Sequence, residues 1–360
     1  MIKYDIDLLT ELCLKFGPSG CEDMVRDCIK EQITDFCSDI SVDSLGNLIA
    51  TLHGKTQKAP KIMLSAHMDE VGFMITDIDE DGYLRFSTLG GIDPRVLCSR
   101  AVTIGDESRQ TNGVIASMAI HHQKKEDMEK ITPVDKMYID IGALSRDDAE
   151  KFVSVGDYGT FLSDFVLFGK NNKMMKCKAI DDRLGCAVMI ETLRHFAKSE
   201  NKAVCDISFA FSVREEVGLS GAITAAYSIN PDFAIVLEST AIADIPDVLP
   251  HSQVAHVGDG GVISLCDRAT IYDSKFIDFA LATGKEKNIP VQIKKYLSGG
   301  NDANHIHKSR EGVRTLALSA PTRYLHSASC VASVADYHAI KDLTVAMIED
   351  IEKLFGKFEV

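Results

Sequence analysis

The sequence predicts an α/β fold, a sandwich of helices around a sheet, interrupted by a small and mostly β domain. From residue 180 onward, continuous apolar runs such as ISFAFSV and FAIVLE alternate with segments whose apolar residues recur at helical spacing. Such runs are typical of central sheet strands with both faces covered. Between residues 73 and 163 the chain carries short strand-like runs separated by Gly, Asp and Asn turns, with few helical patterns. That change predicts a β module inserted into a larger domain.

The first part of the chain is predicted to form two helices followed by strands. Residues 8–16 and 24–33 carry apolar stripes at helical spacing, and GPSG breaks the pattern between them. SVDSLGNLIATL predicts two strands around a Leu-Gly-Asn turn, and KIMLSA predicts a short buried strand that leads to His67.

The insert contains five strand-like runs: FMITDID, YLRFSTLG, AVTIG, GVIASMAI and KMYIDIGA. After it, helices are predicted over residues 182–196, from Tyr272 onward and over residues 334–354, with VRTLALS as another buried strand. The expected parts are therefore a large domain built from residues 1–72 and 165–360, and an inserted β domain at residues 73–164.

The composition is that of a globular protein without a nucleic-acid or membrane partner. Hydrophobic residues make up 45% and charged residues 26% of the 360 residues, which is ordinary for a globular chain. The net charge of −14 disfavours nucleic acid, because phosphate binding needs a basic face. The sequence contains no run of about 18 apolar residues, so no membrane span is predicted. The ten cysteines form no CxxC pair, so we expect reduced thiols and a cytoplasmic location.

Histidines and acids stand where several apolar runs end. His67 ends KIMLSAH, and Asp69 follows two residues later, on the same side of an extended chain. Asp69 is placed to accept a hydrogen bond from the imidazole, which leaves the other ring nitrogen free for a metal. A structural histidine is the simpler explanation of this pair taken alone.

Two pairs of adjacent acids stand at similar places. Asp181 and Asp182 open a predicted helix, where a capping role explains one carboxylate but not both; the functional alternative is a carboxylate that bridges two divalent ions. Glu215 and Glu216 follow ISFAFSVR, and neighbouring side chains on an extended chain point apart. One of them is then free to bind metal while the other faces a substrate water, unless both belong to a solvated loop edge.

Glu238 ends FAIVLE, and His326 lies in the loop TRYLHSAS. Taken singly, they are explained as a cap at a strand exit and an ordinary histidine. Acids at the ends of buried strands cost free energy unless a cation compensates them. A pair of metal ions compensates all of these acids together, so the ordered set predicts a dinuclear metal centre.

In their order and separation, these segments resemble the tetrahedral aminopeptidase family, which includes glutamyl and deblocking aminopeptidases. The motifs that carry the resemblance span most of the chain: SAHMDEVGFMI, KAIDDRLGCAV, SVREEVGLSGA, VLESTAIADIP, SGGNDANHIH and SAPTRYLHSAS. The resemblance implies a three-layer αβα metallopeptidase sandwich with a small inserted β domain. It also implies that this β domain makes dimer contacts, and that dimers assemble into dodecamers with inward-facing active sites.

The resemblance implies a role for each matching residue. Five side chains are implied as ligands of two metal ions: His67 and Glu238 on one, Glu216 and His326 on the other, and Asp181 bridging them. In the same way Asp69 is expected to orient His67, Glu215 is expected to be the general base, and the peptide bond after Asp181 is expected to be cis.

The chain departs from the family pattern at three places. Glu238 stands where the family commonly has Asp, so we expect a ligand with the same charge and altered reach. Gly300, Asn301 and Asp302 stand where the family often has GGTDA, which bears on specificity rather than on the chemistry. After His326 a serine-rich stretch replaces a proline and an acid that relatives often carry.

The implied reaction is the removal of N-terminal residues from peptides. Two divalent ions, zinc or cobalt first and manganese next, share a water molecule and lower its pKa. Glu215 takes the proton and passes it to the leaving amine. The expected partners are peptide substrates and further copies of the chain.

Three alternatives stay open. A metal-dependent deacylase of small N-acyl substrates would use the same two-metal chemistry. A glycoside hydrolase would use a carboxylate pair, but His67, His326 and the absence of tryptophan speak against it. A non-catalytic metal-binding protein would not need Glu215.

Overall fold

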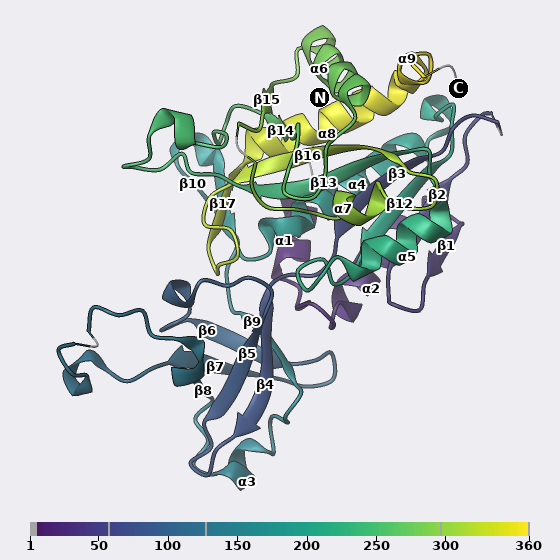
Figure 1. Ribbon diagram of the computed structural model, residues 1–360. Helices are drawn as coiled ribbons and strands as arrows, with labels where there is room; N and C mark the ends of the chain where they lie inside the picture. Colours follow the sequence, from purple (N-terminus) through teal and green to yellow (C-terminus); the bar gives the residue numbers. More distant parts are fainter. Residues whose placement is uncertain (1–5, 57, 127, 296, 359–360) are drawn as a thin grey trace.

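A sandwich of helices and strands and a separate β-barrel make up the molecule (Figure 1). The computed structural model describes four stretches of the chain: residues 6–56, 58–126, 128–295 and 297–358. The sandwich and the barrel confirm the predicted fold class, an αβα sandwich with a small inserted β domain.

Eight strands form the central sheet in the order β1-β2-β12-β3-β13-β16-β14-β15. Their bounds are β1 Ile40–Val42, β2 Leu48–Leu52, β3 Ile62–His67, β12 Ile207–Ser212, β13 Phe233–Ala241, β14 Gly261–Ile263, β15 Val291–Ile293 and β16 Arg314–Thr322. The four central strands β12, β3, β13 and β16 run parallel. Every residue of β3 and β12 is buried, which explains why these strands are continuous apolar runs in the sequence.

Helices cover both faces of this sheet. α4 leads into β12 on one side of β3, whereas α5 leads into β13 on its other side. Right-handed connections that cross a sheet in opposite directions place their helices on opposite faces. α1, α2 and α8 pack against α4, and α7 packs against α5. The bounds of the α-helices are α1 Ile6–Leu14, α2 Asp23–Ile33, α3 Arg146–Ala149, α4 Ile180–Phe196, α5 Ser220–Ile229, α6 Ser274–Lys287, α7 Ala303–Ile306, α8 Val334–Glu349 and α9 Ile351–Phe355.

The inserted segment closes into a six-stranded barrel in the order β4-β5-β8-β7-β6-β9. Its strands are β4 Gly72–Ile78, β5 Leu84–Leu89, β6 Ala101–Gly105, β7 Gln110–Ala116, β8 Tyr138–Asp140 and β9 Tyr158–Phe161. The barrel has its own core, in which the Phe73 ring makes edge contacts with the rings of Phe86 and Phe161 at centroid distances of 5.4 and 5.2 Å. Such aromatic pairs stabilise a small core beyond the area that they bury.

A small sheet lies where the chain leaves the barrel. It pairs β10, β11 and β17 in antiparallel fashion, with the bounds β10 Val166–Phe168, β11 Met174–Cys177 and β17 Cys330–Ser333. Short 3₁₀ turns complete the secondary structure: η1 Pro94–Val96, η2 Ile120–His122, η3 Val134–Lys136, η4 Lys170–Asn172, η5 Ser199–Asn201 and η6 Pro250–Ser252.

Four details differ from the sequence-based expectations. The barrel has a sixth strand, β9, in addition to the five strand-like runs of the insert. Glu238 does not end its strand, because β13 continues to Ala241 through further pairing with β16. The predicted last helix is divided into α8 and α9 at Asp350. Asp181 and Asp182 lie at the start of α4 with non-helical backbone angles. Within the described stretches, no helix is both long and apolar enough to cross a membrane.

Candidate metal centre

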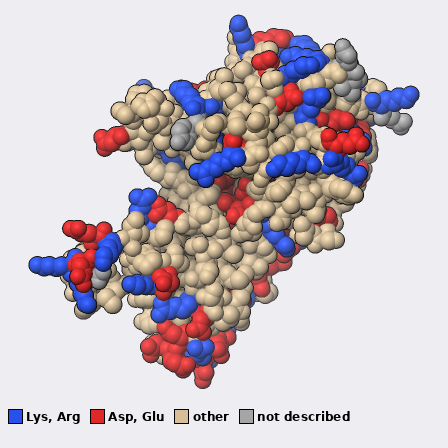
Figure 2. Space-filling view, in the orientation of Figure 1, with Lys and Arg blue, Asp and Glu red and all other residues tan. Residues whose placement is uncertain are grey.

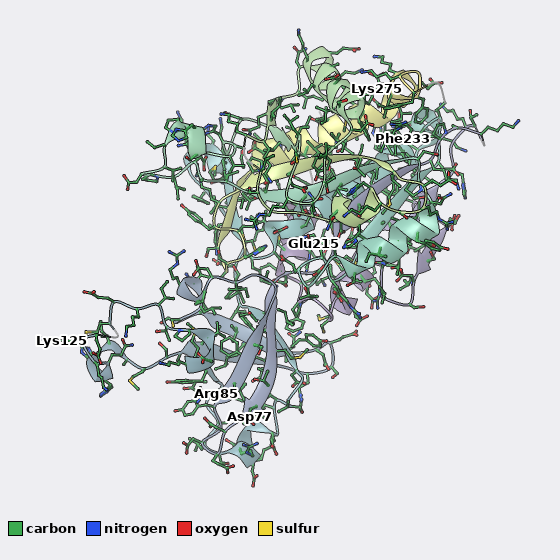
Figure 3. All side chains as sticks on the ribbon, viewed as in Figure 1. Asp77, Arg85, Lys125, Glu215, Phe233 and Lys275 are labelled. Carbon is green, nitrogen blue, oxygen red and sulfur yellow. The ribbon has the colours of Figure 1, made fainter. Side chains whose placement is uncertain are left out.

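The predicted site residues come together at the edge of the central sheet where its parallel strands end. His67 is the last residue of β3 and lies in register with Ser212, the last residue of β12. Glu215 follows shortly after β12, at the point where the sandwich faces the barrel (Figure 3). Glu238 lies in β13, and His326 follows β16. The carboxyl ends of parallel strands are the usual place for a site in open α/β sheets.

The two carboxylate oxygens of Asp181 face two different histidines. Nε2 of His67 is 3.2 Å from Oδ1, and Nε2 of His326 is 3.3 Å from Oδ2. Oε1 of Glu238 is 3.4 Å from Nε2 of His67, and Oε1 of Glu216 is 3.3 Å from Nε2 of His326. Two groups of three donor atoms result, one of His67, Asp181 and Glu238 and one of Asp181, Glu216 and His326, and within each group the atoms lie within 4.8 Å of one another.

Glu215 lies beside these groups. Its Oε2 is 4.0 Å from Nε2 of His67, and it forms a third donor group with His67 and Glu216. The first two groups share only Asp181 and together contain all five predicted ligands. Among the acids of these three donor groups, Glu215 is therefore the one that neither of the first two groups contains.

Main-chain carbonyls orient both imidazoles. Nδ1 of His67 donates to the carbonyl of Asp69 at 3.0 Å, and Nδ1 of His326 donates to the carbonyl of Gly91 at 2.7 Å. A carbonyl oxygen only accepts hydrogen bonds, so Nδ1 carries the hydrogen in each ring. Nε2 is then the atom presented to Asp181, as it is in many metal-binding histidines.

Asp69 contacts His67 through a different group from the one expected. Its carbonyl, rather than its carboxylate, accepts the hydrogen bond from His67, while carboxylate Oδ1 lies 3.5 Å from Nδ1. The carboxylate instead accepts the backbone N–H groups of Glu215 at 3.0 Å and of Glu216 at 3.1 Å. Asp69 thus forms hydrogen bonds with the ring of His67 and with the backbone of both glutamates.

The charge balance of the centre favours a cation. Burial and neighbouring acids raise the pKa of Glu216 and of Glu238 to about 8. Burial also raises the pKa of Glu215 well above its usual range. The buried Oδ1 of Asp181 accepts no hydrogen bond from any described residue. Buried acids in such excess over two histidines fit divalent metal ions, and imidazole nitrogens with carboxylate oxygens are ligands that zinc accepts.

Asp182 has a role that the sequence did not reveal. The peptide bond between Asp181 and Asp182 is cis, as expected. Carboxylate Oδ2 of Asp182 accepts the backbone N–H of His67 at 3.3 Å, and Oδ1 accepts that of Gly185 at 3.0 Å. A Cβ atom on Gly185 would lie 2.5 Å from Oδ2, so only glycine allows this approach. Asp182 therefore ties the end of β3 to the start of α4.

The sequence analysis also did not predict a buried cluster of charged residues beneath the site. Lys178 forms an ion pair with Glu70 over 2.5 Å, and Thr160 of the barrel donates to the other oxygen of Glu70 at 2.8 Å. Arg183 is fully buried and donates to the carbonyls of Leu12 and Gly17. The one sequence signal of this cluster was that its charged residues lie within three positions of Asp69 or Asp181, inside otherwise apolar motifs.

The site opens into a cleft of about 870 Å³. Besides the site residues, its lining includes the cations Arg268 and Lys294 and the glycine-rich stretch that contains Gly299 and Gly300. Figure 2 shows acidic side chains gathered in the hollow between the two parts of the molecule, with basic side chains near its rim. The cleft is large enough for a peptide end.

Comparison with known proteins places this site in context. Residues 46–343 match the family described as M42 glutamyl aminopeptidase. A protein of Acetivibrio thermocellus with a provisional aminopeptidase name is 40% identical over 342 residues, which cover 95% of this chain and 98% of that protein. The lysyl aminopeptidase of Pyrococcus furiosus is 31% identical over 354 residues, covering 97% of this chain and 98% of its own.

Several solved structures are similar to this chain over nearly its whole length. The TET aminopeptidase of a marine-sediment thaumarchaeon superposes with a TM-score of 0.93 at 33% identity, covering 98% of each chain. The TET1 peptidase of Pyrococcus horikoshii, described as assembling into a tetrahedron or a large octahedral shell, gives a TM-score of 0.84 at 33% identity, covering 95% of this chain and 98% of its own. A Thermotoga maritima structure titled endoglucanase gives a TM-score of 0.78 at 32% identity, covering 96% of this chain and 98% of its own.

Proposed function

Because this chain belongs to the M42 glutamyl aminopeptidase family and is a peptide-bond hydrolase, we propose that it is a dinuclear-metal aminopeptidase that removes N-terminal residues from peptides. The observation that carries the proposal is the position of Asp181. Its two oxygens lie 3.2 and 3.3 Å from Nε2 of His67 and of His326. A carboxylate placed in this way is suited to bridge two cations.

The five predicted ligands divide between two ions. In this assignment, His67 and Glu238 would hold one ion, His326 and Glu216 would hold the other, and Asp181 would serve both. Glu238, which is longer than the aspartate common in the family, reaches within 3.4 Å of Nε2 of His67. The mixed nitrogen and oxygen donors suit zinc or cobalt, and manganese after them.

Glu215 is the general base in this proposal. When bound, the two ions lower the pKa of a water molecule and stabilise negative charge on the substrate carbonyl. Glu215 takes a proton from the attacking water and returns it to the leaving amine. Its backbone N–H is held by the carboxylate of Asp69, so the side chain starts from a fixed point at the mouth of the cleft.

The barrel, which we assign to residues 73–164, serves assembly in this proposal, while residues 1–72 and 165–360 form the catalytic domain. The assembly of the Pyrococcus horikoshii TET1 peptidase supports a homo-oligomer for this chain as well, and we propose dimers that build a dodecamer. A closed particle would admit peptides and exclude folded proteins. The ten cysteines are all free thiols, which supports a cytoplasmic location.

The test is a metal-free preparation titrated with zinc, cobalt and manganese against a panel of aminoacyl anilides. N-acetylated amino acids and a soluble β-glucan serve as parallel substrates, since a deacylase and a glycoside hydrolase are the competing functions. We expect metal-dependent release of anilide that saturates near two ions per subunit. Hydrolysis of the N-acetylated amino acids alone would indicate a deacylase, and chelator-insensitive cleavage of the glucan would indicate a glycoside hydrolase.

A further inference from the structure

The segment GPSGCE between α1 and α2, residues 17–22, packs against the start of the barrel insertion. The N–H of Ser19 donates to the carbonyl of Glu70 at 3.2 Å, and the N–H of Glu70 donates to the carbonyl of Gly17 at 3.1 Å. None of the residues in this segment belongs to the donor groups of the metal centre. The segment is nevertheless joined by hydrogen bonds to Asp69 and to the loop that carries Glu215.

Two buried carboxylates hold three successive backbone amides of that loop. Oε1 of Glu22 accepts the N–H of Arg214 at 3.1 Å, while the carboxylate of Asp69 accepts the N–H groups of Glu215 and Glu216. Ser19 Oγ donates to Asp69 at 2.5 Å. The exposed fraction is 5% for Glu22 and 0% for Asp69.

The backbone of the loop explains why it needs these acceptors. Arg214 has a φ of +55°, in the left-handed region that side-chain-bearing residues rarely adopt. Successive N–H groups around such a residue point to one side and form a concavity that accepts a negative group. Glu22 occupies the N-cap position of α2 but makes no capping hydrogen bond there. Its carboxylate is directed instead to the N–H groups of Gly20 and Arg214.

We propose that Glu22 is a positioning residue for Glu215, which acts by fixing the backbone from which the general base projects. The inference rests on the proposed function. Glu22 belongs neither to the donor groups nor to the residues that line the cleft, so its effect on catalysis passes through the backbone of Arg214. A displacement of a catalytic group by about 1 Å lowers turnover by about 100-fold.

The test compares three substitutions at Glu22 with one at its neighbour. Glu22→Ala removes the acceptor, Glu22→Gln keeps an amide oxygen in the same place, and Glu22→Asp withdraws the carboxylate by one methylene. Asp23→Ala is the matched control, because Asp23 is exposed and pairs with Arg26 on the surface of α2. For each variant, kcat, KM, metal content and the hydrogen exchange of a peptide covering residues 213–219 are measured.

We expect Glu22→Ala to lower kcat about 10- to 100-fold, with KM and metal content unchanged and with faster exchange in the 213–219 peptide. Glu22→Gln should restore kcat and protection, Glu22→Asp should be intermediate, and Asp23→Ala should match the parent protein. Unchanged kcat in Glu22→Ala, or equal losses in the Gln and Ala variants, would overturn the proposal.

The exchange measurement keeps this inference separate from the proposed function. Should the parent protein hydrolyse no aminoacyl substrate, the proposed function fails, and protection of the 213–219 peptide still decides whether Glu22 holds the loop. Should Glu22→Ala not fold, the comparison of Glu22→Gln with Glu22→Asp decides it, since only the aspartate withdraws its oxygen from Arg214.

Discussion

The imidazole of His326 in the sandwich donates its Nδ1–H to the carbonyl of Gly91 in the barrel insertion, over 2.7 Å. This bond selects the ring nitrogen that faces Asp181 and Glu216. A second tie between the two parts is the hydrogen bond from Thr160 of the barrel to Glu70 beneath the site. The inserted domain therefore contributes directly to the geometry of the candidate centre, in addition to any part that it plays in assembly.

We predict that Gly90→Ala weakens metal retention at the half of the site that contains His326. Gly90 has a φ of +83°, and a Cβ there would lie 2.8 Å from Val71 Cγ1 and 3.3 Å from Glu216 Cβ. Relief of these contacts moves the carbonyl of Gly91. We expect metal affinity to fall about tenfold, measured by competition with a chelator.

The matched control for this substitution is Gly142→Ala. Gly142 also lies in the barrel insertion and has a φ of +77°, and apart from its chain neighbours no described residue has an atom within 4 Å of the added Cβ. It carries the same backbone strain of about 1 kcal/mol without reaching the site. Equal metal loss in both variants would mean that strain in the barrel, rather than the position of Gly91, affects the site.

A second prediction concerns the general base. Glu215→Gln should lower kcat at least about 100-fold, because glutamine cannot accept the proton of the attacking water, while both metal ions remain bound. Steady-state kinetics and elemental analysis on the same preparation measure the two effects. Glu31→Gln, at an exposed position of α2, is the control. A Glu215→Gln variant that turns over normally would remove Glu215 from this role.

The outline of the fold could be predicted from the sequence because its signals are local. Runs of apolar residues marked β3, β12 and β13, and frequent Gly and Asp turns marked five of the six barrel strands, all but β9. The length of β13 beyond Glu238 could not be predicted in this way, because it depends on pairing with β16, which lies far away in the sequence. The division between α8 and α9 at Asp350 likewise lacked a strong breaker in the sequence.

The candidate site could be predicted from the sequence only in part. Histidines and acids at the strand ends, together with the resemblance to a family, predicted side chains that the fold indeed brings together. The acceptors that orient them could not be predicted, because the carbonyls of Asp69 and Gly91 have no side-chain signature. The contact of Glu22 with Arg214 was equally hidden, since it joins residues 192 positions apart.

A third prediction tests the ligands. His67→Ala and His326→Ala should each lower metal content by about one ion per subunit. His67 supplies the imidazole of the group with Asp181 and Glu238, and His326 supplies that of the group with Asp181 and Glu216. His195→Ala is the control, since His195 lies in the last turn of α4, at the opposite end from Asp181, and pairs with Glu349 at the end of α8. Elemental analysis after gel filtration measures the content. Full occupancy in both ligand variants would contradict the assignment.

A fourth prediction concerns pH and the metal-free protein. The pKa of Glu216 and of Glu238 is raised to about 8, chiefly by burial. Burial alone would lower the pKa of His326, but the hydrogen bond with Asp181 and the charge of Glu216 raise it to about 9. All three groups therefore bind protons more tightly in the folded metal-free protein than in the unfolded chain.

The sign of the pH dependence follows from this difference. The glutamates contribute stability that is complete below their unfolded pKa of about 4.3 and is lost as pH rises through 8. The contribution of His326 is complete below about 6.5 and is lost as pH rises through 9. The chelator-treated protein should accordingly have a lower Tm at pH 9 than at pH 6.

Bound zinc replaces these protons, so the Tm of the zinc-loaded protein should no longer fall between these two pH values. Zinc affinity should rise from pH 6 to pH 9. A chelator-treated protein with a higher Tm at pH 9 would show that these side chains do not share protons in a closely packed centre.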